Sequence, residues 1–275
     1  MLKNCFILFL IFFSASIFAQ EVKFYGEAKQ GGIIIGQGED IIGADLNDTN
    51  LQVDKNGYFV FGFDRDAAGT FILKIHFKDR KTKTFKYLIH KLKYNVQKIR
   101  VAKDFINPPK NILEKIETES ALMKEARSEV GRIDEALYAG GFGNPLDKVE
   151  IGGVFGVQRI LNGKPSNIHN GLDYRAAEGD SIRAITDGIV RIAGEKFFYN
   201  GTFVLLDHGQ GLTSVYLHMS KLLVSKGQKV SKGEVIGLVG STGRATGPHL
   251  HLGVQWYKKR IDPVNLLSIS LQTKQ

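Results

Sequence analysis

Short runs of apolar residues, broken by turn sequences, dominate the first part of this chain of 275 residues and predict β structure. The runs are rich in β-branched and aromatic residues and are separated by turn signals such as Asp54-Lys55-Asn56-Gly57. Spacing of this kind is typical of a small antiparallel β-sandwich, which we expect over residues 20–105. The runs are Val22–Phe24, Gly32–Ile35, Tyr58–Phe63, Thr70–Phe77 and Thr84–Ile89.

The pattern changes to a helical one after Asn107-Pro108-Pro109. Residues 106–139 are predicted to form a linker that contains an amphipathic helix from about Asn111 to Tyr138, which packs against one domain or bridges the two. The apolar positions of this helix recur mostly at steps of three and four residues: Ile112, Ile116, Met123, Ala126, Val130, Ile133 and Leu137.

The last part of the chain, residues 140–275, again contains runs of strand length and is rich in glycine. It predicts a second, antiparallel β domain, so the expected fold class of the whole chain is mainly β. The runs are Ser181–Ile185, Gly188–Ile192, Thr202–Leu206, Leu212–Leu217 and Val235–Val239.

The N-terminus has the pattern of a secretory signal peptide. Lys3 precedes an apolar run from about Cys5 to Phe18, and the small residue Ala19 follows the run. We expect a signal peptide over residues 1–19, export to the periplasm or cell envelope, and no stable membrane span after cleavage. An uncleaved membrane anchor is the alternative, although the run is short for a span. Cys5 is the single cysteine, so the mature chain would have neither a disulfide nor a thiolate metal ligand.

The chain carries 37 basic and 28 acidic residues, a formal net charge of +9. Such an excess favours an anionic partner, which could be nucleic acid, a membrane surface or an anionic cell-wall polymer. No arginine-rich run or nucleic-acid recognition motif accompanies it, so we expect no nucleic-acid partner.

The histidines supply the candidate chemistry. His249 and His251 lie two apart within an apolar alternation, so a strand would present both on one face. His169 and Asp173 lie four apart, which favours one face in a helix or in a strand, and His218 adds a further candidate. Without thiolates, zinc prefers histidine nitrogen and carboxylate oxygen. Two histidines, one aspartate and a water molecule are the pattern of a catalytic zinc site.

The stretch from about Gly153 to Leu267 resembles peptidase family M23, the lysostaphin-type zinc endopeptidases of bacterial cell walls. Three motifs carry the resemblance: His169-x-x-x-Asp173, Tyr216-x-His218 and the segment from Ser241 to His251. The resemblance implies a C-terminal M23 peptidase domain over residues 140–275, with His169, Asp173 and His251 as ligands of one Zn²⁺ ion. It also implies that His218 and His249 flank the open position of the metal.

The expected function is therefore a secreted zinc endopeptidase that cuts peptide cross-links between peptidoglycan stem peptides. A D,D bond is the favoured target, and a glycyl bridge stays open. His249 is the favoured general base, and His218 would bind the oxyanion or the leaving group, although the sequence does not fix which of the two histidines takes the proton.

The alternatives are a catalytically silent M23-like binding module or activator of another hydrolase, and a carrier domain, for which no suitable lysine hairpin is found. The N-terminal domain could target the enzyme, contact a regulatory partner or cover the cleft. Tyr174 could line the site or have a packing role. Arg159 and Asn162 resemble the family's lead-in to the first motif, which suggests a place in the substrate cleft, and His208 is interpreted as a hairpin residue.

Overall fold

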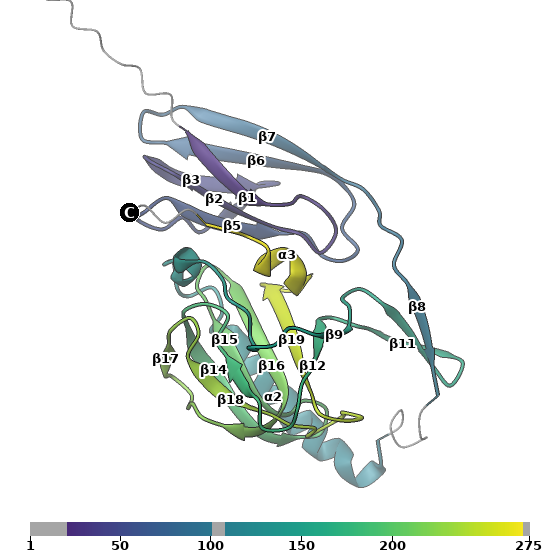
Figure 1. Cartoon of the computed structure of the whole chain (residues 1–275). Coiled ribbons are helices and arrows are strands. Elements are labelled where there is room, and N and C mark those ends of the chain that lie inside the picture. The colour runs from purple at the N-terminus through teal and green to yellow at the C-terminus, as the bar shows by residue number, and fades with distance from the viewer. Residues whose placement is uncertain (1–20, 101–107, 272–275) are drawn as a thin grey trace, which may run out of the picture.

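The computed structural model describes residues 21–100 and 108–271 and confirms a mainly β fold (Figure 1). The signal peptide expected over residues 1–19 lies outside this range. Among the described residues, no helix has the length and apolarity needed to cross a membrane.

The N-terminal part is a sandwich of two antiparallel sheets, ordered β1-β2-β5 and β4-β3-β6-β7. Aromatic side chains from the two sheets meet between them. The rings of Phe24 and Phe85 lie 4.9 Å apart, and those of Phe63 and Phe71 lie 5.0 Å apart. The strands are β1 (Val22–Gly26), β2 (Ile33–Gly38), β3 (Ile41–Leu46), β4 (Thr49–Leu51), β5 (Tyr58–Gly62), β6 (Gly69–Phe77) and β7 (Thr82–Ile89).

The C-terminal part is built on one large sheet whose main path is β17-β14-β15-β16-β19-β12-β9. Every residue of the interior strand β15 is buried, so this strand lies within the core. The strands are β9 (Ile151–Gly153), β10 (Gln158–Leu161), β11 (Lys164–Ile168), β12 (Leu172–Arg175), β13 (Ser181–Arg183), β14 (Gly188–Phe197), β15 (Gly201–Asp207), β16 (Leu212–Leu222), β17 (Lys229–Val230), β18 (Val235–Val239), β19 (His249–Trp256) and β20 (Lys259–Ile261).

The two parts pack directly on each other, with the short helix α3 (Pro263–Leu267) at their junction (Figure 1). The backbone carbonyl of Gly31 accepts hydrogen bonds from Asp262 N at 2.8 Å and from Asn265 Nδ2 at 3.1 Å. Buried side chains of both parts, such as Phe61 and Trp256, belong to one continuous cluster. The sandwich is therefore attached to the C-terminal sheet through a shared apolar core.

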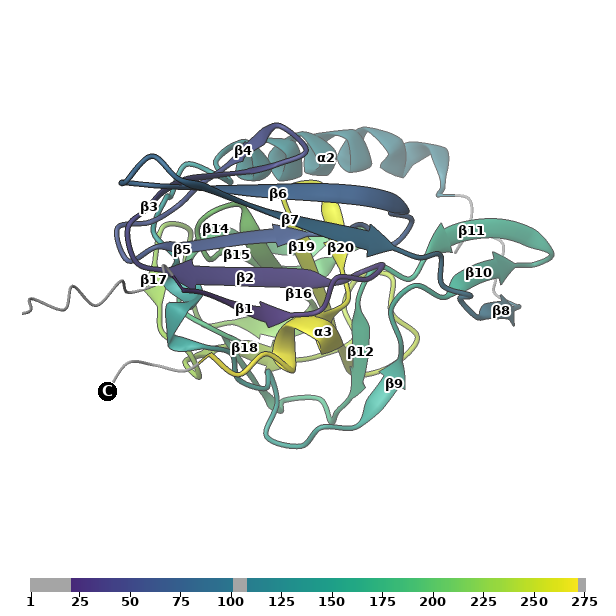
Figure 2. The ribbon, with the colours of Figure 1, turned by 90° about the horizontal axis from the view of Figure 1, so that it is seen from above.

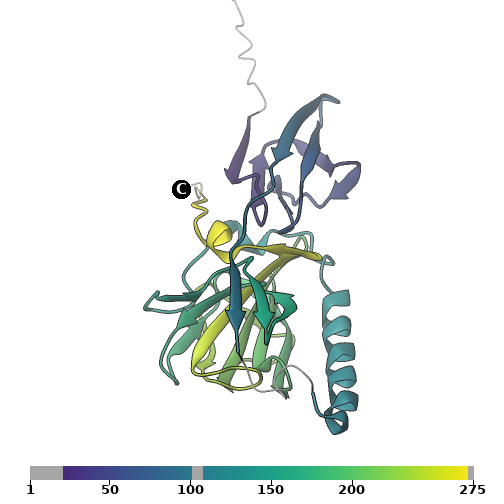
Figure 3. The same cartoon turned by 90° about the vertical axis from the view of Figure 1, so that its right-hand side faces the viewer.

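Strand β8 (Val96–Ile99) links the two parts in a second way. It descends from the sandwich and pairs in parallel with β10, forming a small sheet ordered β11-β10-β8 (Figure 3). Residues on the N-terminal side of the expected boundary at residue 105 therefore complete a sheet of the C-terminal part.

The helix is shorter than predicted. It comprises the 3₁₀ turn η1 (Lys110–Ile112) and α2 (Leu113–Ser128), and it lies along one side of the C-terminal sheet (Figures 2 and 3). The prediction that it extends to Tyr138 is wrong. Gly131 has a φ of +87°, and the carbonyl of Ile133 accepts a hydrogen bond from Gln210 N at 2.7 Å instead of serving a helix. A second 3₁₀ turn, η2, covers Leu137–Gly140.

Candidate metal centre and active site

The pairing of β12 with β19 brings together two of the expected metal ligands. The strands are antiparallel, and their register places Asp173 directly opposite His251. Side chains alternate between the two faces of a strand. Tyr174 and Leu250 consequently point into the core, where they are 1% and 0% exposed, while Asp173 and His251 face the other side. Of the two roles left open for Tyr174, the structure therefore favours packing.

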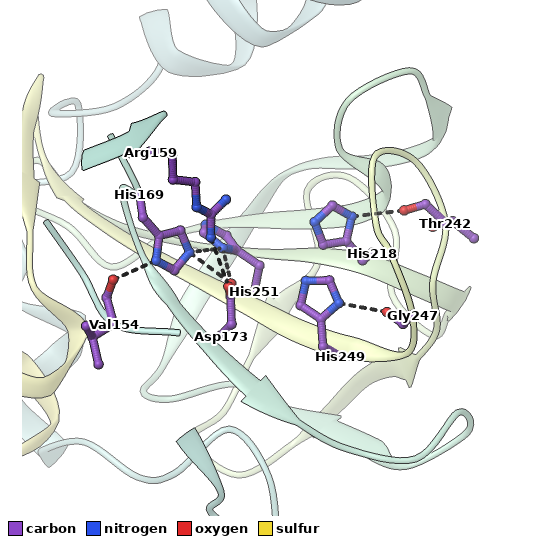
Figure 4. Close-up of polar contacts among 9 residues, drawn as sticks. All are labelled: Val154, Arg159, His169, Asp173, His218, Thr242, Gly247, His249 and His251. Carbon is purple, nitrogen blue, oxygen red and sulfur yellow. Dashed lines mark hydrogen bonds and ion pairs between the residues drawn. The ribbon is translucent and has the colours of Figure 1, made fainter. Parts of the chain in front are cut away.

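His169 precedes β12 and is held by backbone and side-chain hydrogen bonds. Its N–H donates to Val157 O at 2.9 Å, and its carbonyl accepts from Gly156 N at 2.8 Å. The ring Nδ1–H donates to Val154 O at 2.7 Å, which leaves the lone pair of Nε2 directed at the other two ligands (Figure 4).

Three atoms with available lone pairs converge at this point. His169 Nε2 lies 3.0 Å from Asp173 Oδ1 and 3.2 Å from His251 Nδ1, and the last two atoms are 2.7 Å apart. Ligands bound tetrahedrally to zinc at about 2.0–2.2 Å would lie about 3.3–3.6 Å apart, so the three atoms need to separate by only a few tenths of an ångström, at most about 1 Å, to hold the ion. The donor set, two imidazoles and one carboxylate, therefore fits a zinc ion with a position open for water.

Burial and mutual contacts keep these ligands in the forms that bind a metal. Burial alone raises the pKa of the Asp173 carboxyl, but the close approach of the imidazoles of His169 and His251 outweighs it and holds that pKa well below its usual range. Burial lowers the pKa of His251 against the opposing effect of Asp173. At neutral pH the site thus offers a charged carboxylate and an unprotonated His251 ring.

The remaining two histidines lie beside the metal ligands. His218 is on β16, next to Leu217, which pairs with His251, and His249 begins β19. The ring centroids of His218 and His249 are 4.8 Å apart. Each ring donates its Nδ1–H to a carbonyl of the loop between β18 and β19, His218 to Thr242 O at 2.9 Å and His249 to Gly247 O at 2.8 Å (Figure 4). With Nδ1–H engaged in this way, each ring directs its Nε2 away from these carbonyls, toward a substrate or water.

His218 has two further properties of a functional residue. Its φ of +67° is in the left-handed region, which costs a non-glycine residue about 1–3 kcal/mol and occurs preferentially at functional sites. Burial lowers its pKa to about 4, so the ring is neutral at pH 7.

A cleft lies over the five residues. It consists of two adjoining hollows of about 710 and 500 Å³ that share Arg159, Leu161, His218, Arg244 and His251 as lining residues. Strands β8 and β9 form one wall of the larger hollow, where Val96, Ile151 and Val154 present exposed apolar side chains. The site is thus open to an extended ligand.

The structure brings all five sequence-predicted site residues into this one cleft. Arg159, a weaker sequence candidate, also lines it, whereas the buried ring of His208 donates and accepts elsewhere, between Asp187 O and Ser214 Oγ. Sequence reasoning missed the carbonyl acceptor Val154 and gave no role to Arg244. A backbone carbonyl carries no sequence signal, but Arg244 lies within the motif segment and could have been identified there.

Comparison with known proteins agrees with this geometry. Residues 167–263 match the sequence model of peptidase family M23, so the chain contains a peptidase M23 domain. A Pseudomonas aeruginosa protein assigned to peptidase M23 has a similar solved structure, with a TM-score of 0.63 and 25% identity. The similarity covers 89% of this chain and 96% of that one.

Two curated relatives match part of the chain. The DD-carboxypeptidase/endopeptidase Mpg of Neisseria meningitidis is 40% identical over 139 residues, which are 50% of this chain and 31% of the relative. The peptidoglycan DD-endopeptidase ShyA of Vibrio cholerae is 48% identical over 83 residues, 30% of this chain and 19% of the relative. The matched stretch thus spans about a third or less of each curated relative.

Proposed function

We propose that this protein is a zinc-dependent endopeptidase that hydrolyses D,D peptide cross-links between peptidoglycan stem peptides. The observation that carries the proposal is the convergence of the lone pairs of His169, Asp173 and His251 beside two further histidines, His218 and His249, in an open cleft. The M23 domain and the names of the curated relatives support the substrate class.

The metal ligands and the two other histidines have separate tasks in this reaction. A bound zinc ion would polarise the scissile carbonyl and lower the pKa of a water molecule toward about 7. Asp173 and His251 lie opposite each other on paired strands, so the fold already places their side chains side by side. Val154 O accepts the Nδ1–H of His169 and so keeps this ring in the tautomer that can bind a metal through Nε2. The protein thus supplies a prearranged ligand set.

His249 is the proposed general base. Gly247 O holds its Nδ1–H, so Nε2 can take a proton from water and return it to the leaving amine. His218 is neutral at pH 7, and Thr242 O holds its Nδ1–H. Its Nε2 can therefore accept an N–H of the substrate on the leaving side, whereas a hydrogen bond to an oxyanion would require a second proton on the ring. Of the two roles expected for His218, the leaving-group role fits the neutral ring better.

A peptidoglycan substrate implies that the enzyme acts outside the cytoplasm, in the periplasm or cell envelope. Export by the signal peptide expected over residues 1–19 agrees with this location, and the net charge of +9 favours contact with an anionic wall. A regulatory partner of the N-terminal sandwich stays a prediction.

The test is muropeptide analysis of purified peptidoglycan after incubation with the mature chain and zinc. We expect cross-linked dimers to fall and monomers to rise, and we expect neither change with the His249→Ala and Asp173→Ala variants or after chelation of the metal. His90→Ala, which replaces an exposed histidine next to β7, is the matched control and should behave as the unmodified protein. Unchanged dimers with the active chain and zinc would contradict the proposal.

A further inference from the structure

Two arginines in the cleft have no part in the chemistry described so far. Arg159 is on β10 and Arg244 is in the loop between β18 and β19, so the fold brings them together from distant parts of the chain. Both line both hollows of the cleft, in company with His218 and His251. Among the described lining residues of these hollows, Asp173 is the only acidic one, and it belongs to the metal centre.

Arg159 is held next to the metal ligands. Its Nη2 lies 3.4 Å from Asp173 Oδ2, the carboxylate oxygen that does not face the two histidines (Figure 4). Its Nε is buried and has no hydrogen-bond partner among the described residues. The Arg159 side chain as a whole is 34% exposed and lines the cleft, so its other guanidinium N–H groups can reach a ligand near the metal centre.

Arg244 is held in place by Tyr199. Its backbone N–H donates to Tyr199 O at 3.1 Å, and its guanidinium lies 5.3 Å from the centroid of the Tyr199 ring. Burial lowers the pKa of Arg244, and the charge of Arg159 also lowers it against the opposing effect of Tyr199. The two side chains line the same two hollows, so their like charges repel each other across the cleft. An anionic group between them would relieve this repulsion.

We propose that Arg159 and Arg244 bind a free carboxylate of the substrate, on the carbon attached to the scissile amide nitrogen. The inference rests on the proposed function, since it assigns the charged group that the same cleft selects. The planar guanidinium matches a carboxylate in a two-point hydrogen bond, which a lysine ammonium does not. A carboxylate at that carbon is only a few bonds from the scissile carbonyl, which agrees with the contact between Arg159 and the metal ligand Asp173.

This clamp would decide which bonds are cut. In a D-Ala–diaminopimelate cross-link, the carbon on the amine side of the scissile bond carries a free carboxylate. A terminal D-Ala-D-Ala bond has the same feature, so the clamp admits carboxypeptidase activity as well. A bond inside a glycine bridge has no charge at this carbon, so it would form no such contact with the two guanidinium groups. The clamp therefore favours the D,D bond over the glycyl bridge.

The test uses two synthetic cross-linked dimers that differ only in this carboxylate, which is free in one and amidated in the other. With zinc, we expect kcat/KM to be about 10- to 100-fold higher for the free form, the range for a hydrogen bond to a charged group. Arg244→Gln should lower kcat/KM for the free form alone, which brings the ratio of the two kcat/KM values close to one. Arg244→Lys should recover only part of this ratio. Arg175→Gln, an exposed arginine of β12 that pairs with Glu150, is the matched control and should keep the full ratio.

A binding measurement separates failure of the clamp from failure of the proposed function. Calorimetric titration of both dimers into zinc-loaded His249→Ala protein reports recognition without cleavage. Preferred binding of the free form, without cleavage of either dimer by the unmodified enzyme, would support the clamp and contradict the endopeptidase. Equal affinity for the two dimers would overturn the clamp whether or not the bond is cut. An equal loss of affinity for both dimers in Arg244→Gln would also overturn it.

Discussion

Gly171 lies between two of the proposed zinc ligands, and its replacement by alanine tests whether the close packing of the metal centre is required. A methyl group at this position would place its carbon 2.6 Å from His251 Nε2, and closer still to the carbonyl oxygen of Leu252. Favourable contacts between nonbonded heavy atoms begin near 3.5 Å. The Gly171→Ala variant must therefore displace the His251 ring or the β19 backbone by about 1 Å.

The displacement can be converted into two measurable losses. Metal sites tolerate ligand displacements of about 0.2 Å, so a shift several times larger should lower the affinity for zinc at least as much as loss of a supporting hydrogen bond, about 10- to 100-fold. Overpacking a tight site costs about 1–3 kcal/mol, so the free energy of unfolding without metal should fall by a similar amount.

The affinity is measured by competition with a chromogenic zinc chelator, and the stability by urea denaturation in the presence of EDTA. Gly140→Ala is the matched control, because a methyl group there would meet no atom within 4 Å. A Gly171→Ala protein with the zinc affinity and stability of this control would refute the reasoning that the ligand ring leaves no space for a side chain.

Three other perturbations test separate parts of the structure. Asp173→Asn removes the charge of the ligand set and should weaken zinc binding by more than about 100-fold in the same competition assay; unchanged affinity would exclude this carboxylate as a ligand. The pKa of His218 is about 4 in the folded chain and near 6.5 in the unfolded chain. As the pH drops, the unfolded chain therefore takes up the proton first, and the free energy of unfolding should fall by about 3 kcal/mol between pH 6.5 and pH 4. Urea denaturation at both pH values should show a smaller loss for His218→Gln, and an equal loss would contradict the assignment. Glu119 of α2 accepts the backbone N–H of Phe198 at 2.8 Å, so Glu119→Ala should cost about 1–3 kcal/mol and accelerate hydrogen exchange at Phe198; unchanged exchange would mean that this contact does not hold the helix.

The strands that were predicted from sequence are those with an uninterrupted apolar or alternating pattern, such as β5 and β6. Strands β3 and β4 were missed. Gly43 and Asp45 interrupt the apolar pattern of β3, and β4 is a three-residue strand with two exposed polar residues. Their pairing partners, not their own residues, hold them in the sheet. The same reason explains the helix end, where tertiary hydrogen bonds take the backbone groups that a longer α2 would have used.

The sequence by itself determined the chemistry that is available. It contains the histidines and the aspartate in three motifs, no cysteine beyond residue 5, and the two-residue spacing that puts His249 and His251 on one face of a strand. Only the tertiary structure decided how these groups are used. The register that sets Asp173 against His251, the carbonyls that orient His169, His218 and His249, and the approach of Arg159 to Arg244 all join residues far apart in the chain. Such contacts depend on strand pairing and on backbone groups that every residue carries, so no local pattern of side chains encodes them.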